Sequence, residues 1–284
     1  MAADITAIIL TKNEEVNIVD CIKSIDTIVK RIIVIDSFST DKTVEYAKNC
    51  GAEVYQHPFE NYAKQYMYAV QIAQIKTMWT LRIDADERLT PDSADELERL
   101  CCSNMNTDVS GIVLRFKKNF LGKDLSHGGV YPWKKMNCYK TQYGAIEDRS
   151  MDEHIVLSQG RTLEMKNDCL HFDFKNLEFF INKHNWYSSR ETVDYFQNLE
   201  KAKSKKELDF KTWFKMNFYY KLPMGLRAHI YYIYRYYLKL GFLDGKEGKI
   251  YAFLQAYWYR YLVDAKIYES EKMGTRYKGI GELK

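Results

Sequence analysis

Over the first ninety residues, short apolar runs alternate with longer segments of mixed polarity. Four short, mostly apolar runs lie at residues 5–10, 31–35, 52–55 and 79–83. The segments between them place apolar side chains at helical spacing, as at Val16, Val19, Ile22 and Ile25. Short apolar runs without alternation are typical of strands buried on both faces. Strands that alternate with helices predict an α/β fold with a mostly parallel sheet.

Polar residues follow three of these predicted strands, at residues 11–14, 36–41 and 84–87. Ligands of such sheets bind beyond the carboxyl ends of the strands, so these loops are expected to share one site. In an extended chain Asp84 and Asp86 point the same way. Carboxylate oxygens suit Mg²⁺ or Mn²⁺, and substrate phosphates complete the shell. The alternative is an acidic loop after a strand.

The first two loops carry no glycine cradle for phosphate. The chain lacks G-x-G-x-x-G after the first strand and has no P-loop motif, which disfavours a dinucleotide-dependent dehydrogenase. Phosphate is therefore expected to be held by a metal and by side chains. Asp36 is a candidate contact to a nucleotide base or ribose, and the alternative is that Asp36 and Asp41 cap the next helix.

A second acidic cluster, at residues 147–154, offers Asp152 and Glu153. An inverting sugar transfer needs a general base that takes the proton from the acceptor hydroxyl, and either carboxylate suits this role. His171 ends a further short predicted strand and is a candidate second metal ligand, because imidazole also binds Mn²⁺. The alternative for His171 is a structural role.

Charge is unevenly distributed along the chain. Residues 201–284 hold 18 Lys/Arg and 8 Asp/Glu, whereas residues 1–200 hold 24 and 30. With the lysine-rich segment 201–206 as a linker, we expect a catalytic domain at 1–200 and a basic, aromatic helical region at 201–284. A basic tail predicts an anionic partner. Its basic residues interleave with apolar ones, which disfavours nucleic acid.

Two apolar stripes at helical spacing mark this C-terminal region. The first contains Leu226, Ile230, Ile233, Tyr237 and Leu240; the second contains Ile250, Phe253, Leu254, Tyr257, Trp258 and Tyr261. They predict two antiparallel amphipathic helices separated by a break at residues 241–245. Aromatics with flanking lysines are typical of helices that lie on an anionic membrane surface. The alternative is a helical hairpin packed on the catalytic domain with its aromatic residues inside.

Other features bear on the compartment. No run reaches the roughly 18 apolar residues that a membrane span needs, and no signal peptide is recognisable at the start of the chain. The six cysteines form no C-x-x-C or zinc-type spacing, so we interpret them as reduced thiols. These features predict a cytoplasmic protein, peripheral on the inner face of the cytoplasmic membrane.

Three ordered motifs carry a resemblance to a known family. They are residues 8–15 (Ile-Ile-Leu-Thr-Lys-Asn-Glu-Glu), 34–43 (Val-Ile-Asp-Ser-Phe-Ser-Thr-Asp-Lys-Thr) and 83–87 (Ile-Asp-Ala-Asp-Glu). The chain resembles family 2 glycosyltransferases of the GT-A fold. Residues 128–132, 151–154 and 241–245 resemble a bacterial subgroup that includes a lipopolysaccharide core glucosyltransferase and capsule and exopolysaccharide enzymes.

The resemblance implies roles for single residues. A first group would bind the nucleotide-sugar: Thr11, Asn13, Glu14, Asp36, Lys64, Asp84 and Lys183. Asp86 and His171 would bind Mn²⁺ or Mg²⁺. Glu153 matches the glutamate of the subgroup's Val-His-Glu, here Met-Asp-Glu, so Asp152 stays a rival for the base. Residues 134–138 (Lys-Lys-Met-Asn-Cys) replace the usual Arg-Leu-Phe.

The predicted function is an inverting, metal-dependent glycosyltransferase. It would move a sugar from a UDP-linked donor to a saccharide acceptor, with a lipid-linked acceptor at the membrane indicated by the basic aromatic tail. The resemblance implies a place in bacterial cell-surface polysaccharide or lipopolysaccharide synthesis. A nucleotidyltransferase and a non-catalytic membrane-surface scaffold are the alternatives.

Overall fold

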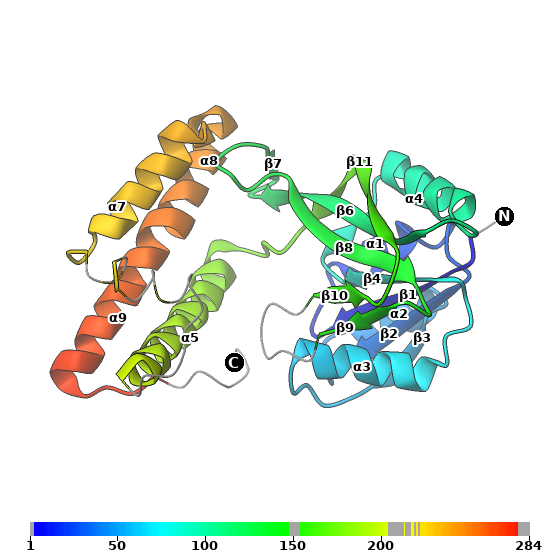
Figure 1. The fold of residues 1–284 in the computed structure, drawn as a ribbon, viewed down its shortest axis with the longest axis horizontal. Helices are drawn as coiled ribbons and strands as arrows, with labels where there is room; N and C mark the ends of the chain where they lie inside the picture. Colours follow the sequence, from blue (N-terminus) through cyan, green and yellow to red (C-terminus); the bar gives the residue numbers. More distant parts are fainter. Residues whose placement is uncertain are drawn as a thin grey trace. The chain divides into compact units, whose positions relative to one another are not determined.

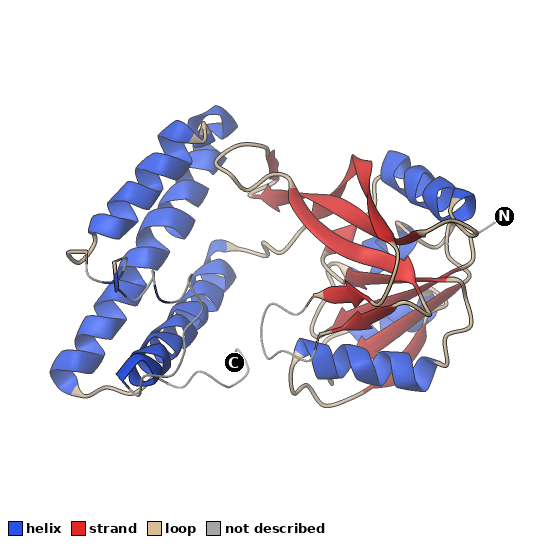
Figure 2. Cartoon of the chain, in the orientation of Figure 1, coloured by secondary structure: helices blue, strands red, loops and turns tan. Residues whose placement is uncertain are grey.

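The chain forms two compact units. The structure, a computed structural model, describes residues 3–147, 154–203 and 222–277, with residues 213, 217, 218 and 220 (Figure 1). Unit 1 comprises Met1–Asn119 and Pro132–Asp173, and unit 2 comprises Phe120–Tyr131 and Phe174–Lys284. The units divide between Asp173 and Phe174, before helix α5 (Leu177–Lys203), which belongs to unit 2; the boundary expected at residues 200 and 201 lies within α5. In the described residues, strands dominate unit 1 and helices dominate unit 2 (Figure 2).

The sheet of unit 1 begins with four parallel strands, as predicted. Their order is β3-β2-β1-β4, and their bounds are β1 (Ile5–Thr11), β2 (Arg31–Asp36), β3 (Glu53–Gln56) and β4 (Trp79–Asp84). The connecting helices are α1 (Ile18–Lys23), α2 (Thr43–Asn49) and α3 (Tyr62–Ala73). The α/β fold class is therefore confirmed.

Beyond β4 the sheet becomes mixed. Strand β8 (Trp133–Lys140) lies antiparallel between β4 and β6 (Val109–Phe120), and β11 (Arg161–His171) lies parallel to β6. The short β5 (Glu87–Arg88) pairs antiparallel with the end of β11. The remaining elements are α4 (Pro91–Ser103), β7 (Lys123–Leu125), β9 (Gly144–Ile146) and β10 (Ile155–Leu157).

Strand β1 is buried along its whole length because helices cover both faces of the sheet. Its side chains alternate between two core clusters: Ala7 and Ile9 pack in the cluster that contains α1, and Ile8 and Leu10 pack in the one that contains α3. An apolar run without alternation is what this two-sided burial requires. The register also aligns strand ends, with Thr11 opposite Asp36 and Leu10 opposite Asp84.

Unit 2 is built from two long helical stretches and α5. The first stretch is α7 (Leu226–Ile233) continued by a π-helical segment, η2 (Tyr234–Leu238). The second is α8 (Gly245–Ala252), η4 (Phe253–Trp258) and α9 (Tyr259–Met273), of which α9 packs on α5. A short 3-10 turn, η3 (Gly241–Asp244), reverses the chain at the predicted break. No helix in the described ranges is both long and apolar enough to span a membrane.

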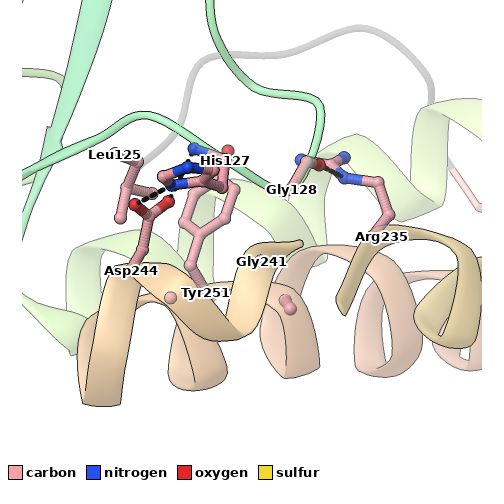
Figure 3. Close-up of a pocket in the computed structure, with 9 residues that line it drawn as sticks. Leu125, His127, Gly128, Arg235, Gly241, Asp244 and Tyr251 are labelled. Carbon is pink, nitrogen blue, oxygen red and sulfur yellow. Dashed lines mark hydrogen bonds and ion pairs between the residues drawn. The ribbon is translucent and has the colours of Figure 1, made fainter. Parts of the chain in front are cut away.

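Hydrogen bonds from Asp244, Lys239 and Arg235 hold the segment 120–131 against the helices of unit 2. Asp244 accepts hydrogen bonds from the backbone N–H of Ser126 and of His127 (2.8 Å for His127), and its Oδ1 lies 2.8 Å from His127 Nδ1 (Figure 3). Gly128 N–H donates to the Lys239 carbonyl at 2.8 Å, and Arg235 Nε donates to the Gly128 carbonyl. These contacts line a small pocket and fix the segment to unit 2.

Candidate active site

The loops after β1 and β2 are interlocked by hydrogen bonds. The backbone N–H of Asn13 donates to Ser39 Oγ at 2.8 Å, and the N–H of Thr40 donates to Asn13 Oδ1 at 2.8 Å. Asn13 has φ of 53°, a left-handed conformation that asparagine tolerates better than most residues. The N–H of Glu14 donates to Thr43 Oγ1 at 2.8 Å. The structure therefore brings two predicted nucleotide loops together.

Asp36 is fully buried and organises its own loop. Its Oδ2 accepts from Ser39 N–H and from Gln56 Nε2, both at 2.9 Å, and its Oδ1 accepts from the Ser39 hydroxyl. Neither aspartate is the N-cap residue of α2, which is Lys42 and has no side-chain cap. Asp41 lies one residue earlier, and its Oδ1 accepts from Thr43 N–H at 3.0 Å, whereas Asp36 shapes the turn.

The other predicted nucleotide residues occupy different surroundings. Thr11 is 5% exposed, and its Oγ1 has no hydrogen-bond partner among the described residues. Glu14 Oε2 accepts from Asn17 Nδ2 at 2.8 Å. Lys64, near the start of α3, is half exposed and pairs with Glu60. Lys183 lies on α5 in unit 2, where its Nζ is 5.9 Å from the centre of the Phe179 ring.

The end of β4 brings the proposed metal ligands together. Asp86 Oδ2 lies 3.5 Å from His171 Nε2, with side chains 22% and 8% exposed. The pairing of β5 with the end of β11 places them so: His171 is opposite Glu87, and Phe172 N–H donates to the Asp86 carbonyl at 2.7 Å. Because 84 residues separate Asp86 from His171 along the chain, no local sequence pattern predicts this approach. Their role as ligands stays a prediction.

Lys135, Asn137 and Trp133 complete this corner, and the sequence interpretation did not identify them. Lys135 Nζ lies 2.7 Å from Glu87 Oε1 and 3.3 Å from Asp84 Oδ2. Asn137 Nδ2 donates to Glu87 Oε2 at 3.3 Å, and the Trp133 ring lies 4.8 Å from that of His171. The available signal was the period-two spacing of 133, 135 and 137, which places the three side chains on one face of strand β8.

The charges in this corner shift one another's protonation. Burial would raise the pKa of Asp84, but Lys135, Arg82 and His171 outweigh it and lower the pKa to about 2. Burial raises the pKa of Glu87, and Lys135 offsets only part of this effect. Burial opposes the charge on Lys135, yet Glu87 and Asp84 together raise its pKa. Lys135 is therefore a fixed cation that holds Asp84 ionised.

A hard divalent cation fits this corner. Asp84 Oδ1 and His171 Nδ1 are buried and have no hydrogen-bond partner among the described residues, an arrangement that costs free energy unless a bound group satisfies it. Asp86 and His171 supply an oxygen and a nitrogen, the donor types that Mn²⁺ accepts. The described residues contain no group of three or more His, Cys, Asp or Glu arranged to hold a metal.

The candidate base residues cannot be placed. Asp152 and Glu153 lie outside the described residues, between Glu147 and His154. The described residues on either side of them are in contact, because Glu147 N–H donates to the His154 carbonyl at 2.9 Å.

Comparisons with known proteins agree on a family. Residues 6–156, more than half of the 284, match the family model described as "Glycosyl transferase family 2". An uncharacterized glycosyltransferase of Rickettsia typhi is 28% identical over 198 residues, 67% of each chain. The lipopolysaccharide core biosynthesis glycosyltransferase LpsC of Rhizobium meliloti is 25% identical over 285 residues, 96% of this chain and 94% of that one.

Among solved structures, glucosyl-3-phosphoglycerate synthase of Mycobacterium tuberculosis, in complex with Mn²⁺, UDP and glucosyl-3-phosphoglycerate, is similar to part of the chain. It is 22% identical, with a TM-score of 0.32, and the match covers 40% of this chain and 44% of that one. The family assignment rests on the sequence match alone. That match favours sugar transfer over the nucleotidyltransferase and scaffold alternatives.

Proposed function

Because the chain belongs to glycosyl transferase family 2, we propose that it is an inverting, divalent-metal-dependent enzyme that transfers a sugar from a UDP-linked donor to a saccharide. The observation that supports this most is the approach of Asp86 to His171, at 3.5 Å, beside the interlocked loops after β1 and β2. Three strand ends thereby supply an anionic, partly unsatisfied corner of the kind that a metal-bound diphosphate would complete.

The residues of this corner have distinct roles in the proposed reaction. A cation held by Asp86 and His171 would neutralise charge that develops on the leaving diphosphate. Lys135 keeps Asp84 ionised at neutral pH, so Asp84 can accept hydrogen bonds from ribose or base hydroxyl and N–H groups. Thr11 offers a hydroxyl at the end of β1 for the nucleoside.

The reaction class is tested by measuring UDP release from a panel of UDP-sugars with Mn²⁺ or Mg²⁺. Loss of the metal ligand in Asp86→Asn should lower turnover roughly a thousandfold, because the metal contributes several kcal/mol to the transition state. Asp95→Asn, on an exposed position of α4, is the matched control and should behave as wild type. Turnover that needs no metal and survives Asp86→Asn would contradict the proposal, and release of pyrophosphate would support the nucleotidyltransferase instead.

The general base is proposed to be Glu153, with Asp152 as the rival. Glu153→Gln should abolish sugar transfer while UDP still binds, as measured by calorimetry, because only the proton acceptor is lost. Normal transfer by this variant, together with an inactive Asp152→Asn, would assign the role to Asp152.

For the acceptor, we propose a lipid-linked saccharide at the inner face of the cytoplasmic membrane, in cell-surface polysaccharide or lipopolysaccharide synthesis. The similarity to LpsC over 96% of the chain supports this choice. Incubation with labelled donor and bacterial membranes should place label in the lipid-extractable fraction. Label confined to free oligosaccharide would point to a soluble acceptor.

A further inference from the structure

The helix formed by α7 and η2 exposes its apolar stripe and buries its arginines, the reverse of a surface helix in an ordinary soluble protein. The apolar stripe of Leu226, Ile230, Ile233, Tyr237 and Leu240 is 42–55% exposed. Arg227 and Arg235 on the same helix are only 4% and 8% exposed. Surface helices normally turn such a stripe inward and their charges outward. The stripe predicted from sequence therefore exists, and in this structure it faces solvent.

This orientation is held by polar contacts on the inner side. Arg227 forms an ion pair with Asp264 of α9, both nearly buried, and its guanidinium lies over the Tyr220 ring at 4.3 Å. Arg235 donates to the Gly128 carbonyl and, at 3.1 Å, to the Tyr231 hydroxyl. Rotating the helix to bury its leucines would break these contacts and strand Asp264 without its cation. The exposed stripe is thus a consequence of the fold of unit 2.

The exposed apolar surface continues across the turn and onto the second helical stretch. Leu243 in η3 and Phe253 in η4 are 53% and 48% exposed. Ring contacts join the two stretches: Tyr232 lies 6.5 Å from Tyr257, which stacks on Phe253 at 5.6 Å. We call this surface, represented by Ile233, Tyr237, Leu238, Leu240, Leu243 and Phe253, the apolar face. Single exposed apolar residues are ordinary, whereas a contiguous set marks an interaction site.

Positive charge predominates around the apolar face, although Glu247 of α8, 4.0 Å from Lys123, lies among its lysines. Residues 210–243 contain no Asp or Glu. Lys239, Lys246 and Lys249 are exposed along the turn and the start of α8, and Lys239 Nζ lies 5.6 Å from the Tyr234 ring centre. Tyrosine, phenylalanine and lysine side by side are the composition of surfaces that lie at the headgroup level of anionic bilayers. Each basic residue near such a surface adds to the attraction.

We propose that the apolar face docks on an anionic lipid bilayer, with its leucines and aromatics at the acyl boundary and its lysines on lipid phosphates. The described helices do not span a membrane, so the contact is peripheral. A second copy of this chain is the less favoured occupant. A symmetric dimer would set the predominantly basic face against the same face, so that like charges would meet.

Vesicle flotation with the full chain tests this inference. The protein should float with vesicles of phosphatidylcholine and phosphatidylglycerol, less with phosphatidylcholine alone, and less at high salt because screening weakens the lysine contacts. The double variant Leu238→Glu/Leu243→Glu should reduce partitioning at least about tenfold, since two exposed leucines no longer enter the bilayer. Its thermal unfolding should match wild type, because both side chains are exposed.

The matched control is Val16→Glu/Val70→Glu in unit 1, whose side chains are 65% and 42% exposed. It carries the same added charge and should bind vesicles as wild type does. Failure of the wild-type chain to bind anionic vesicles would overturn the inference, and a dimer that the leucine variant abolishes, seen by sedimentation, would assign the face to a second copy. UDP release from soluble UDP-sugar should persist in the leucine variant, so this outcome is separable from the proposed reaction.

Discussion

Unit 1 and unit 2 both bury charge, but they use it differently. At the end of β4, Glu87 is fully buried and is neutralised by Lys135, which also reaches Asp84. In unit 2, Arg227 is buried and neutralised by Asp264. Both pairs obey the rule that a buried charge needs a partner. Buried charge is therefore no indicator of function on its own.

The difference lies in what surrounds each pair. At the strand ends of unit 1, Thr11 Oγ1, Asp84 Oδ1 and His171 Nδ1 are buried polar atoms without hydrogen-bond partners among the described residues. Around Arg227, the unusual feature is apolar and outward, the exposed stripe of α7. Unit 1 thus gathers such atoms where a polar ligand could bind, whereas unit 2, which also has one at Gln255 Oε1, offers exposed apolar surface to an apolar phase.

Removing the cation of unit 2 should have the largest effect on stability. Arg227→Met leaves Asp264 nearly buried without its counter-ion and should cost about 4 kcal/mol in the free energy of unfolding. Urea unfolding measures this, and adding Asp264→Asn should restore part of the loss. Lys239→Met, at an exposed position of the same stretch, should change stability by less than about 0.5 kcal/mol. Equal losses of unfolding free energy in Arg227→Met and Lys239→Met would show that the ion pair of Arg227 with Asp264 does not stabilise the fold.

Removing the cation of unit 1 should cost somewhat less. Lys135→Met leaves buried Glu87 facing Asp84 and should lower the free energy of unfolding by about 3 kcal/mol. The loss is smaller than for Arg227→Met because the Lys135 side chain is itself 24% exposed. Lys134, the next residue of β8, pairs with Glu164 at 2.8 Å where both are more than 40% exposed. Lys134→Met should therefore cost below about 1 kcal/mol. A double-mutant cycle with Glu87→Gln isolates the coupling, and its absence would remove Lys135 from this role.

Acidic pH should lower the free energy of unfolding by a smaller amount, through the titration of Asp84. The pKa of Asp84 is about 2 in the folded chain against 3.8 for an unperturbed aspartate. Because the folded pKa is the lower one, Asp84 stabilises the fold above about pH 4, and about 2 kcal/mol of that contribution disappears as pH falls to 2. Glu87 has a raised pKa, so its titration affects stability only above pH 4.5.

Urea unfolding between pH 2 and 5 tests this contribution. The unfolding free energy of wild type should fall more steeply than that of Asp84→Asn. Parallel curves for the two proteins would mean that Lys135 does not hold Asp84 ionised.

Much of unit 1 was predictable because local pattern determines it. Apolar runs of four to six residues located β1, β2, β3 and β4, and their alternation with helices predicted that these strands are parallel. This placed the loops at 11–14, 36–41 and 84–87 at one edge, where the structure has them. The approach of Asp86 to His171 is consistent with the roles that the family resemblance implies. No local pattern could have predicted it, because the two residues are far apart in the chain.

By itself, the sequence determined the parallel half of the sheet and the existence of both apolar stripes, because these follow from the spacing of side chains along single elements. It also determined the family, through the match of residues 6–156 to the family model. The tertiary structure alone decided that Lys135 neutralises Glu87, that α5 belongs to unit 2, and that the stripe of α7 faces outward. Each of these depends on contacts between residues distant in the chain. Such contacts are set by which buried charges find partners, as Arg227 does with Asp264, and no periodicity records that choice.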